Sequence, residues 1–263
     1  LAALTPYILS GQIQKIRIST RPDYISPDIL DLLRNYHVDI IELGVQSFDD
    51  EVLVRSGRGH TVRQTEEACR LIKQGGFELG IQLMVGLPSD SRVKSLHSAK
   101  KALEMKPDFI RIYPTIVLNG SKLAEEFILG NYRPFPRTET VEIVKEMVRI
   151  FDNNHIPVIR IGLKSTDNIS VNTDLSGTYH PAFRQLVESG LAYDEMLHQI
   201  RQSGLTSGVM TLSANPASFS NLAGHKGINK RKLRIIYPDI RFVFRPDDEI
   251  PERTYLVIPQ SAD

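Results

Sequence analysis

The chain has 263 residues, of which 41% are hydrophobic and 24% charged, enough to bury the core of one large α/β domain with or without a small appendage. Lys and Arg number 32 against 31 Asp and Glu, so the near-neutral total predicts neither a polyanionic nor a polycationic partner for the chain as a whole. A single cysteine, Cys69, excludes an internal disulfide framework and suits the reducing cytoplasm, and no apolar run has the length to span a bilayer.

Strands and helices alternate over residues 1–163, which is typical of a parallel sheet with crossover helices. The opening stretch "LAALTPYILSGQIQ" resembles the last turns of a helix closed by Ser10 and Gly11, so we expect the sequence to begin within a domain. Capping residues such as Ser26 and Thr61 mark the helix starts. The expected strands are Lys15–Thr20, Asp39–Val45, Leu79–Leu87, Phe109–Val117 and Pro157–Leu163, and the expected helices are 26–36, 61–76, 89–106 and 138–154.

The chain changes character after residue 163. The polar stretch 164–181 is typical of a loop, and a helix is expected over 182–202. Short elements follow: a strand at 209–214, a helix at 218–224, a basic helix at 228–237 and a strand at 239–244. We therefore predict three regions, namely residues 1–163, 164–208 and 209–263, the last being a small basic α+β module.

Polar side chains gather where the expected strands end. In a parallel α/β sheet these ends share one edge, where ligands bind. The set has amide, hydroxyl and guanidinium groups but no paired nucleophile and base, no metal-ligand cluster and no phosphate loop. Such an edge is suited to binding a polar cofactor, and the cofactor would then perform the reactive step. The residues are Thr20, Arg21, Gln46, Ser47, Gln82, Met84, Tyr113, Pro114 and Thr115.

Several motifs, in their order and spacing, resemble one known superfamily. They are "ISTRPDYI", "IELGVQSFDDEVL", "GRGHT", "GIQLMVGLP" and "IRIYPTIVLNGSKL". This series resembles the radical S-adenosylmethionine (radical SAM) superfamily, nearest to the branch of the Elongator catalytic subunit and its bacterial look-alikes, with oxygen-independent coproporphyrinogen oxidase more distant. The resemblance runs from about Lys15 to Leu191, and "VIRIGL" and "GTYHPAF" resemble the bacterial Elongator-like proteins, which lack the acetyltransferase domain.

The resemblance implies a partial (β/α)6 barrel, with strands three to six present, that holds SAM and a [4Fe-4S] cluster. Reductive cleavage of SAM would give a 5′-deoxyadenosyl radical that abstracts hydrogen from the substrate, with a reductant such as flavodoxin or ferredoxin. By the same resemblance, Gln46 and Ser47 contact the ribose or methionine part of SAM, and Gln82 contacts the ribose. Arg21 faces the methionine carboxylate or the substrate. The backbone of Tyr113, Pro114 and Thr115 lines the adenine pocket, and Met84 lies beside it.

The chain departs from the family at the cluster. The family ligands are cysteines spaced C-x3-C-x2-C after the first barrel strand, whereas this chain has only Cys69, within an expected helix. We therefore expect the ligands and two further strands upstream of Leu1. The full-length chain would then be the enzyme and the fragment alone would be inactive. The alternative is a truncated relic of the fold.

Each candidate residue also has a structural interpretation. Gln46 and Gln82 could be buried amides bonded to backbone, Arg21 could pair with Asp23 or Asp50, and Met84 could serve packing alone. Four further residues are substrate candidates that could equally be structural: His60, Arg111, Arg160 and His180. The two arginines interrupt apolar strands and need partners, so they would bind an anionic substrate if they point into the barrel and be solvated or paired if they point outward.

The C-terminal module contains a Gly-x-x-Gly loop, Gly224 to Gly227, between two short helices flanked by strands. This order resembles the KH module, whose loop lets the backbone approach nucleotide phosphates. Five cations follow within nine residues: Lys226, Lys230, Arg231, Lys232 and Arg234. The module therefore suggests RNA contact, and a solvated basic helix is the alternative.

We conclude from the sequence that the chain is part of a cytoplasmic radical SAM enzyme whose substrate is a tRNA base or a base-derived small molecule such as a queuine-like deazapurine. The alternative is a non-catalytic RNA-binding protein that acts through the basic C-terminal module and keeps the barrel as a scaffold.

Overall fold

The computed structural model describes residues 1–166 and 169–260 and divides into two compact units, Leu1–Pro181 and Ala182–Asp263. The boundary between the two units falls after Pro181. The sequence suggested two changes instead, one after residue 163 and one after residue 208. The polar loop belongs to the first unit because Asp174 in this loop accepts hydrogen bonds from the backbone N–H groups of Val117 and Tyr179. The long helix that follows belongs to the second unit because its apolar face enters that unit's core.

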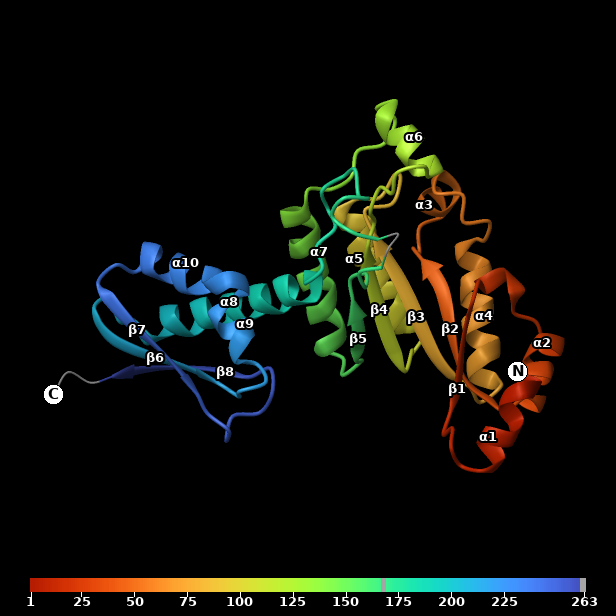
Figure 1. Cartoon of the computed structure of the whole chain (residues 1–263), viewed down its shortest axis with the longest axis horizontal. Coiled ribbons are helices and arrows are strands. Elements are labelled where there is room, and N and C mark those ends of the chain that lie inside the picture. Colours follow the sequence, from red (N-terminus) through yellow and green to blue (C-terminus); the bar gives the residue numbers. More distant parts are fainter. Residues whose placement is uncertain (167–168, 261–263) are drawn as a thin grey trace. The chain divides into compact units, whose positions relative to one another are not determined.

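The first unit is built on a parallel sheet of five strands in the order β1-β2-β3-β4-β5 (Figure 1). The expected α/β architecture is confirmed. The resemblance implied four barrel strands, but the strand expected near residue 160 also pairs with its neighbour in this sheet. The strands are β1 (Ile16–Thr20), β2 (Val38–Gln46), β3 (Glu78–Val85), β4 (Phe109–Pro114) and β5 (Val158–Ile161).

Helices connect these strands and begin at the capping residues that the sequence suggested. Ser26 caps α2, and Thr61 forms a capping box with Gln64 at the start of α4. Two short helices, α3 and α6, were not predicted. The helices are α1 (Thr5–Leu9), α2 (Pro27–Asn35), α3 (Asp50–Arg55), α4 (Val62–Gln74), α5 (Arg92–Glu104), α6 (Lys122–Ile128) and α7 (Arg137–Asp152), with 3-10 turns at Ala2–Leu4 and Pro22–Tyr24.

Alternation along the strands separates the two faces of the sheet. Leu79, Ile81, Leu83 and Val85 of β3 are fully buried on the face that α4, α5 and α7 cover. The opposite face, which we call the inner face, carries the intervening residues. They are Glu42 and Gly44 of β2, Gly80, Gln82 and Met84 of β3, Phe109, Arg111 and Tyr113 of β4, and Arg160 of β5. Polar groups on this face are thus a direct result of the strand periodicity.

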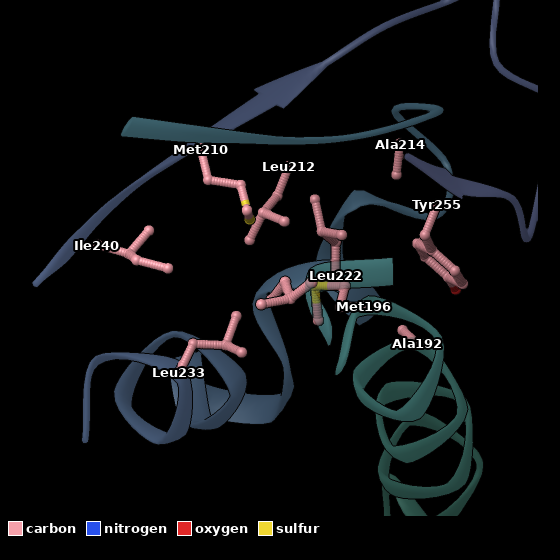
Figure 2. Packing of buried hydrophobic residues seen from close by; sticks show 10 residues of the cluster. Ala192, Met196, Met210, Leu212, Ala214, Leu222, Leu233, Ile240 and Tyr255 are labelled. Atoms are coloured by element: carbon pink, nitrogen blue, oxygen red, sulfur yellow. The ribbon is translucent and has the colours of Figure 1, made fainter. Parts of the chain in front are cut away.

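The second unit has a three-stranded sheet in the order β7-β6-β8, with β6 parallel to β7 and antiparallel to β8. Met210 and Leu212 of the central strand pack against Met196, Leu222 and Leu233 of the helices (Figure 2). The order of strand, helix, Gly-x-x-Gly loop, helix and strand is present as expected, and β8 adds a strand that was not predicted. The elements are α8 (Phe183–Ser203), β6 (Gly208–Ala214), α9 (Phe219–Ala223), α10 (Ile228–Ile236), β7 (Ile240–Pro246) and β8 (Tyr255–Gln260), with a 3-10 turn at His225–Gly227.

Candidate site at the strand ends

Two amides meet where β2 and β3 approach their carboxyl ends. Gln82 Nε2 donates a hydrogen bond to Gln46 Oε1 at 3.1 Å, so the structure brings these two predicted residues together. Gln46 is buried and has a positive φ of 67°, an uncommon conformation for a residue other than glycine. Its amide lies over Gly44, where an added Cβ would come within 2.7 Å of Gln46 Nε2. A strained backbone at Gln46 and a missing side chain at Gly44 thus hold this amide pair on the inner face.

Arg58 is the residue that our sequence interpretation missed, although it stands within the quoted "GRGHT" motif. Its Nη2 donates to Met84 Sδ at 3.1 Å, and its Nε is buried without a hydrogen-bond partner. Burial lowers the pKa of the guanidinium, and no carboxylate pairs with it among residues 1–166 and 169–260. A half-buried cation that has only a thioether as partner is suited to binding an anionic group of a ligand.

Arg58 and Met84 line a cavity of about 550 Å³ at the strand ends. The cavity is also lined by Thr115 and Leu118, which precede α6, and by Lys122, which begins it. The Thr115 hydroxyl is buried and has no hydrogen-bond partner in the described part of the chain. The cavity therefore offers a cation and a hydroxyl that are both unsatisfied, together with the apolar contacts of Met84.

Other predicted cofactor residues lie apart from this cavity or are already engaged. Arg21 donates to Asp23 Oδ1 and Oδ2 at 2.9 and 2.6 Å, so the salt-bridge alternative is present. The Ser47 hydroxyl lies 3.3 Å from the Ser98 hydroxyl of α5 and accepts from the Asp49 N–H, which makes it part of the turn after β2. Tyr113 is buried, and burial raises the pKa of its phenol. Pro114 ends β4, and the N–H of the next residue continues the ladder to β3.

The substrate candidates fall into different environments. His60 is buried, and its Nε2 donates to the Val45 carbonyl at 3.1 Å while Nδ1 has no partner among the described residues. His180 is half-buried in the loop after Tyr179. Arg111 and Arg160 are register partners on the inner face, so both are on the barrel side. Arg111 Nη1 is 2.6 Å from Glu42 Oε1, whereas Arg160 Nε donates to the Gly162 carbonyl.

The cations of the C-terminal module are not equivalent. The Lys230 ammonium lies 4.6 Å from the centre of the Phe244 ring and 6.0 Å from that of Phe219, so it is held over aromatic rings. Lys226, Arg231 and Arg234 are exposed, and Lys232, although exposed, has its ammonium 5.0 Å from the centre of the Tyr193 ring. Gly224 is buried, and an added Cβ would lie within 2.8 Å of the Asn229 backbone nitrogen. The first glycine of the loop therefore has a packing role, and the exposed cations form a separate surface.

The residues present do not fit an iron–sulfur cluster. Cys69 is buried within α4, and burial raises the pKa of its thiol to about 12. A cluster ligand is a thiolate, which this environment disfavours. No group of three or more His, Cys, Asp or Glu side chains able to hold a metal ion occurs in the described residues. The described helices also include none that is both long enough and apolar enough to cross a membrane.

Comparison with known families identifies the fold. The family model described as "Radical SAM superfamily" matches residues 2–99, and the one described as "Radical_SAM C-terminal domain" matches residues 107–193. These two adjoining matches contain the strand ends described above. The chain belongs to the radical SAM superfamily.

Two of the relatives are tRNA uridine(34) acetyltransferases by name, and a third is an Elongator complex protein. A tRNA uridine(34) acetyltransferase of Methanocaldococcus jannaschii is 35% identical over 130 residues, which are 48% of this chain and 24% of the relative. A protein of the same name from Dehalococcoides mccartyi is 28% identical over 206 residues, covering 74% of this chain and 44% of the relative. Elongator complex protein 3 of Saccharomyces cerevisiae is 32% identical over 139 residues, covering 51% and 25%. The chain thus spans 24–44% of the length of these three relatives.

A solved structure supports the same assignment. The archaeal Methanocaldococcus infernus Elp3 with an N-terminal deletion superposes with a TM-score of 0.58 and 26% identity, over 73% of this chain and 42% of that chain. The radical SAM fold of the first unit and the Elongator-like branch that the motifs suggested are therefore confirmed.

Proposed function

We propose that this chain forms the SAM-binding and substrate-binding part of a radical SAM enzyme that modifies a tRNA base. The observation that carries the proposal is the unpaired Arg58 guanidinium beside Met84 and the unsatisfied Thr115 hydroxyl in one cavity. SAM has a carboxylate, a ribose with two hydroxyls and an adenine, and these match a cation, an amide pair and an apolar wall with a hydroxyl.

The roles of the chain's own residues follow from their positions. Arg58 would bind the carboxylate of SAM, and the Gln46–Gln82 pair would hold the ribose hydroxyls. Met84 and Thr115 would line the adenine. When bound, SAM supplies the radical chemistry of the superfamily, and these side chains fix its position relative to the substrate. The residues described do not supply ligands for the cluster, so no role in cluster binding is assigned to them.

Replacing Arg58 by glutamine should weaken SAM binding by about 10-fold or more, because a hydrogen bond to a charged group contributes about 1.5–3 kcal/mol. Isothermal titration of SAM into the wild type and the variant measures this directly. Arg63→Gln is the matched control, since Arg63 is an exposed arginine of α4 outside the cavity lining. Equal SAM affinity in the wild type and Arg58→Gln would contradict the assignment.

The tRNA substrate is proposed from the names of the relatives and from the basic module. Three relatives with tRNA or Elongator names match 48%, 74% and 51% of this chain, and α10 presents exposed cations in the second unit. A second candidate function, RNA binding without catalysis, is favoured by that same surface. Binding measurements distinguish the two functions. A protein that binds both RNA and SAM supports the enzyme, whereas one that binds RNA but not SAM supports RNA binding without catalysis.

The basic surface leads to a separate prediction. The triple variant Lys226→Gln/Arg231→Gln/Arg234→Gln should weaken tRNA binding and reduce the slope of log K against log salt by about 2, because each lost phosphate contact removes roughly 0.7–0.9. Lys230→Gln is the control, since Lys230 lies over aromatic rings and is only half exposed. Fluorescence anisotropy with labelled tRNA at several salt concentrations provides both quantities. If the triple variant keeps the wild-type slope, α10 is only a solvated basic helix.

A further inference from the structure

The segment that follows α3 contacts the carboxyl ends of three strands through three consecutive residues. Arg58 contacts β3, and the Gly59 carbonyl accepts a hydrogen bond from Arg21 Nη2, just after β1, at 3.4 Å. The next residue, His60, contacts β2. Of the three, only His60 is buried, with 5% of its surface exposed. The segment therefore joins the strand ends at which we propose that SAM binds, and its buried member has no role among the binding groups assigned above.

The strand β2 is irregular at the point that His60 contacts. Its register with β3 shifts between Leu43 and Gln46, so that positions 44 and 45 together face the single residue Gln82, which is the pattern of a β-bulge. The Ser47 N–H donates to the Val45 carbonyl at 2.8 Å and closes a three-residue turn around Gln46. With φ 67° at its centre, this is the rare and strained form of such a turn. A strained backbone persists only where its surroundings hold it.

The bulge determines where the Gln46 amide points. Gln46 is level with Leu83, whose side chain is buried on the covered face of the sheet. The Gln46 amide nevertheless lies over Gly44 and accepts a hydrogen bond from Gln82 on the inner face. An extra residue in a strand reverses the alternation of side chains beyond it, and the positive φ of Gln46 turns this side chain back. The amide pair therefore depends on the form of this turn.

His60 supplies a second hydrogen bond to the Val45 carbonyl. Its Nε2 lies 3.1 Å from that oxygen, and since a carbonyl only accepts, the ring carries a proton on Nε2. A carbonyl oxygen has two lone pairs, and the N–H of Ser47 and the Nε2–H of His60 use both. The other ring nitrogen, Nδ1, is buried without a hydrogen-bond partner among residues 1–166 and 169–260. The bond to the turn is thus the hydrogen bond that fixes the ring in the described chain.

We propose that His60 is a positioning residue of the SAM site, which holds the Val45 carbonyl and thereby keeps the Gln46 amide on the inner face. It acts through Gln46 and does not contact the ligand. Arg58, which we assign to the SAM carboxylate, stands two residues before His60, so one short segment sets the spacing between the cation and the amide pair. The effect on SAM rests on the proposed function, whereas the effect on Gln46 can be tested without SAM.

The first test measures SAM affinity by isothermal titration, at a temperature where thermal unfolding shows every variant to be folded. His60→Leu removes the donor and keeps an apolar side chain in its place. It should weaken SAM binding about 10-fold, because a displaced amide no longer bonds to the ribose. His60→Gln keeps an N–H near the position of Nε2 and should bind SAM within about threefold of the wild type. A loss of stability with unchanged SAM affinity in His60→Leu would overturn the proposal.

A second pair of variants shows whether His60 acts through Gln46. The variant Gln46→Ala has no amide to position, so adding His60→Leu to it should change SAM affinity by less than about twofold. A residue that contacts SAM directly would instead cause the same loss in both backgrounds. Equal losses in the wild-type and Gln46→Ala backgrounds would therefore contradict the positioning role.

Nuclear magnetic resonance of the protein without SAM separates this inference from the proposed function. The His60 ring should be the Nε2–H tautomer, and the Gln82 side-chain amide should give a resonance shifted by its bond to Gln46. This shift should be lost in His60→Leu and kept in His60→Gln. A shift that persists in His60→Leu would reject the positioning role and, with normal SAM binding, leave the enzyme proposal standing. The expected spectra from a protein that does not bind SAM would support the positioning of Gln46 and count against the enzyme proposal.

Discussion

Arg111→Gln is expected to lower the free energy of unfolding by about 3 kcal/mol, the effect of removing one partner of a buried ion pair. Glu42 has a side chain only 2% exposed, and Arg111 is its one close partner, at 2.6 Å. Without that guanidinium the carboxylate would be a buried charge with only Arg17, at 4.0 Å, to compensate. Urea unfolding at neutral pH, followed by circular dichroism, measures the change.

Arg160→Gln is the matched control for this prediction. Arg160 is the register partner of Arg111 on β5, and no carboxylate pairs with it among the described residues. Its replacement should cost less than about 1 kcal/mol. The double variant Glu42→Gln/Arg111→Gln should recover part of the loss, because no unpaired charge remains. Equal losses for Arg111→Gln and Arg160→Gln would show that Glu42 does not depend on Arg111.

The alternation of strands and helices could be predicted because local signals mark it. Ser26 and Thr61 accept the capping hydrogen bonds that their positions suggested, and apolar runs such as Leu79–Val85 became buried strands. The helix α3, with six residues, is too short to show a period. The strand β8 was also missed, because its pairing with β6 joins residues more than 40 positions apart.

Part of the candidate site could also be predicted from local features of the sequence. A general rule about strand ends led to Met84, which lines the cavity, and to Gln46 and Gln82, which hydrogen-bond to each other. Ser47 follows Gln46 directly, yet its hydroxyl contacts α5 because the chain turns there. Arg58 stands in an irregular segment, so no periodic pattern placed it beside Met84.

The partner of Arg111 could not be predicted from the sequence of each strand taken separately. We expected Arg111 to need a partner, but the partner is 69 residues away on β2, and only the sheet order brings the two together. Register depends on how the whole sheet assembles, and one sequence does not contain that information in a local pattern. The ion pair between Glu42 and Arg111 therefore became visible only with the structure.

Gly224→Ala is expected to destabilise the second unit by about 3 kcal/mol. Gly224 has φ 79° and ψ 156°, a backbone conformation that is essentially restricted to glycine. An added Cβ would lie 2.7 Å from Asn229 Cγ and 2.8 Å from its backbone nitrogen. Asn229 cannot retreat easily, because its buried amide donates to the carbonyls of Ser189 and Asn221. Thermal unfolding of the variant, with circular dichroism as readout, tests the expected loss.

Gly227→Ala is the control that separates packing from loop function. Gly227 also has a positive φ, of 73°, but an added Cβ would meet only Arg231 Nη1, at 3.7 Å. Its replacement should cost about 1 kcal/mol, the penalty of the left-handed conformation alone. If both alanine variants unfold at the same temperature, the contact with Asn229 does not explain Gly224. If only Gly224→Ala is strongly destabilised, this glycine is accounted for by packing, and any RNA contact of the module depends on its exposed cations.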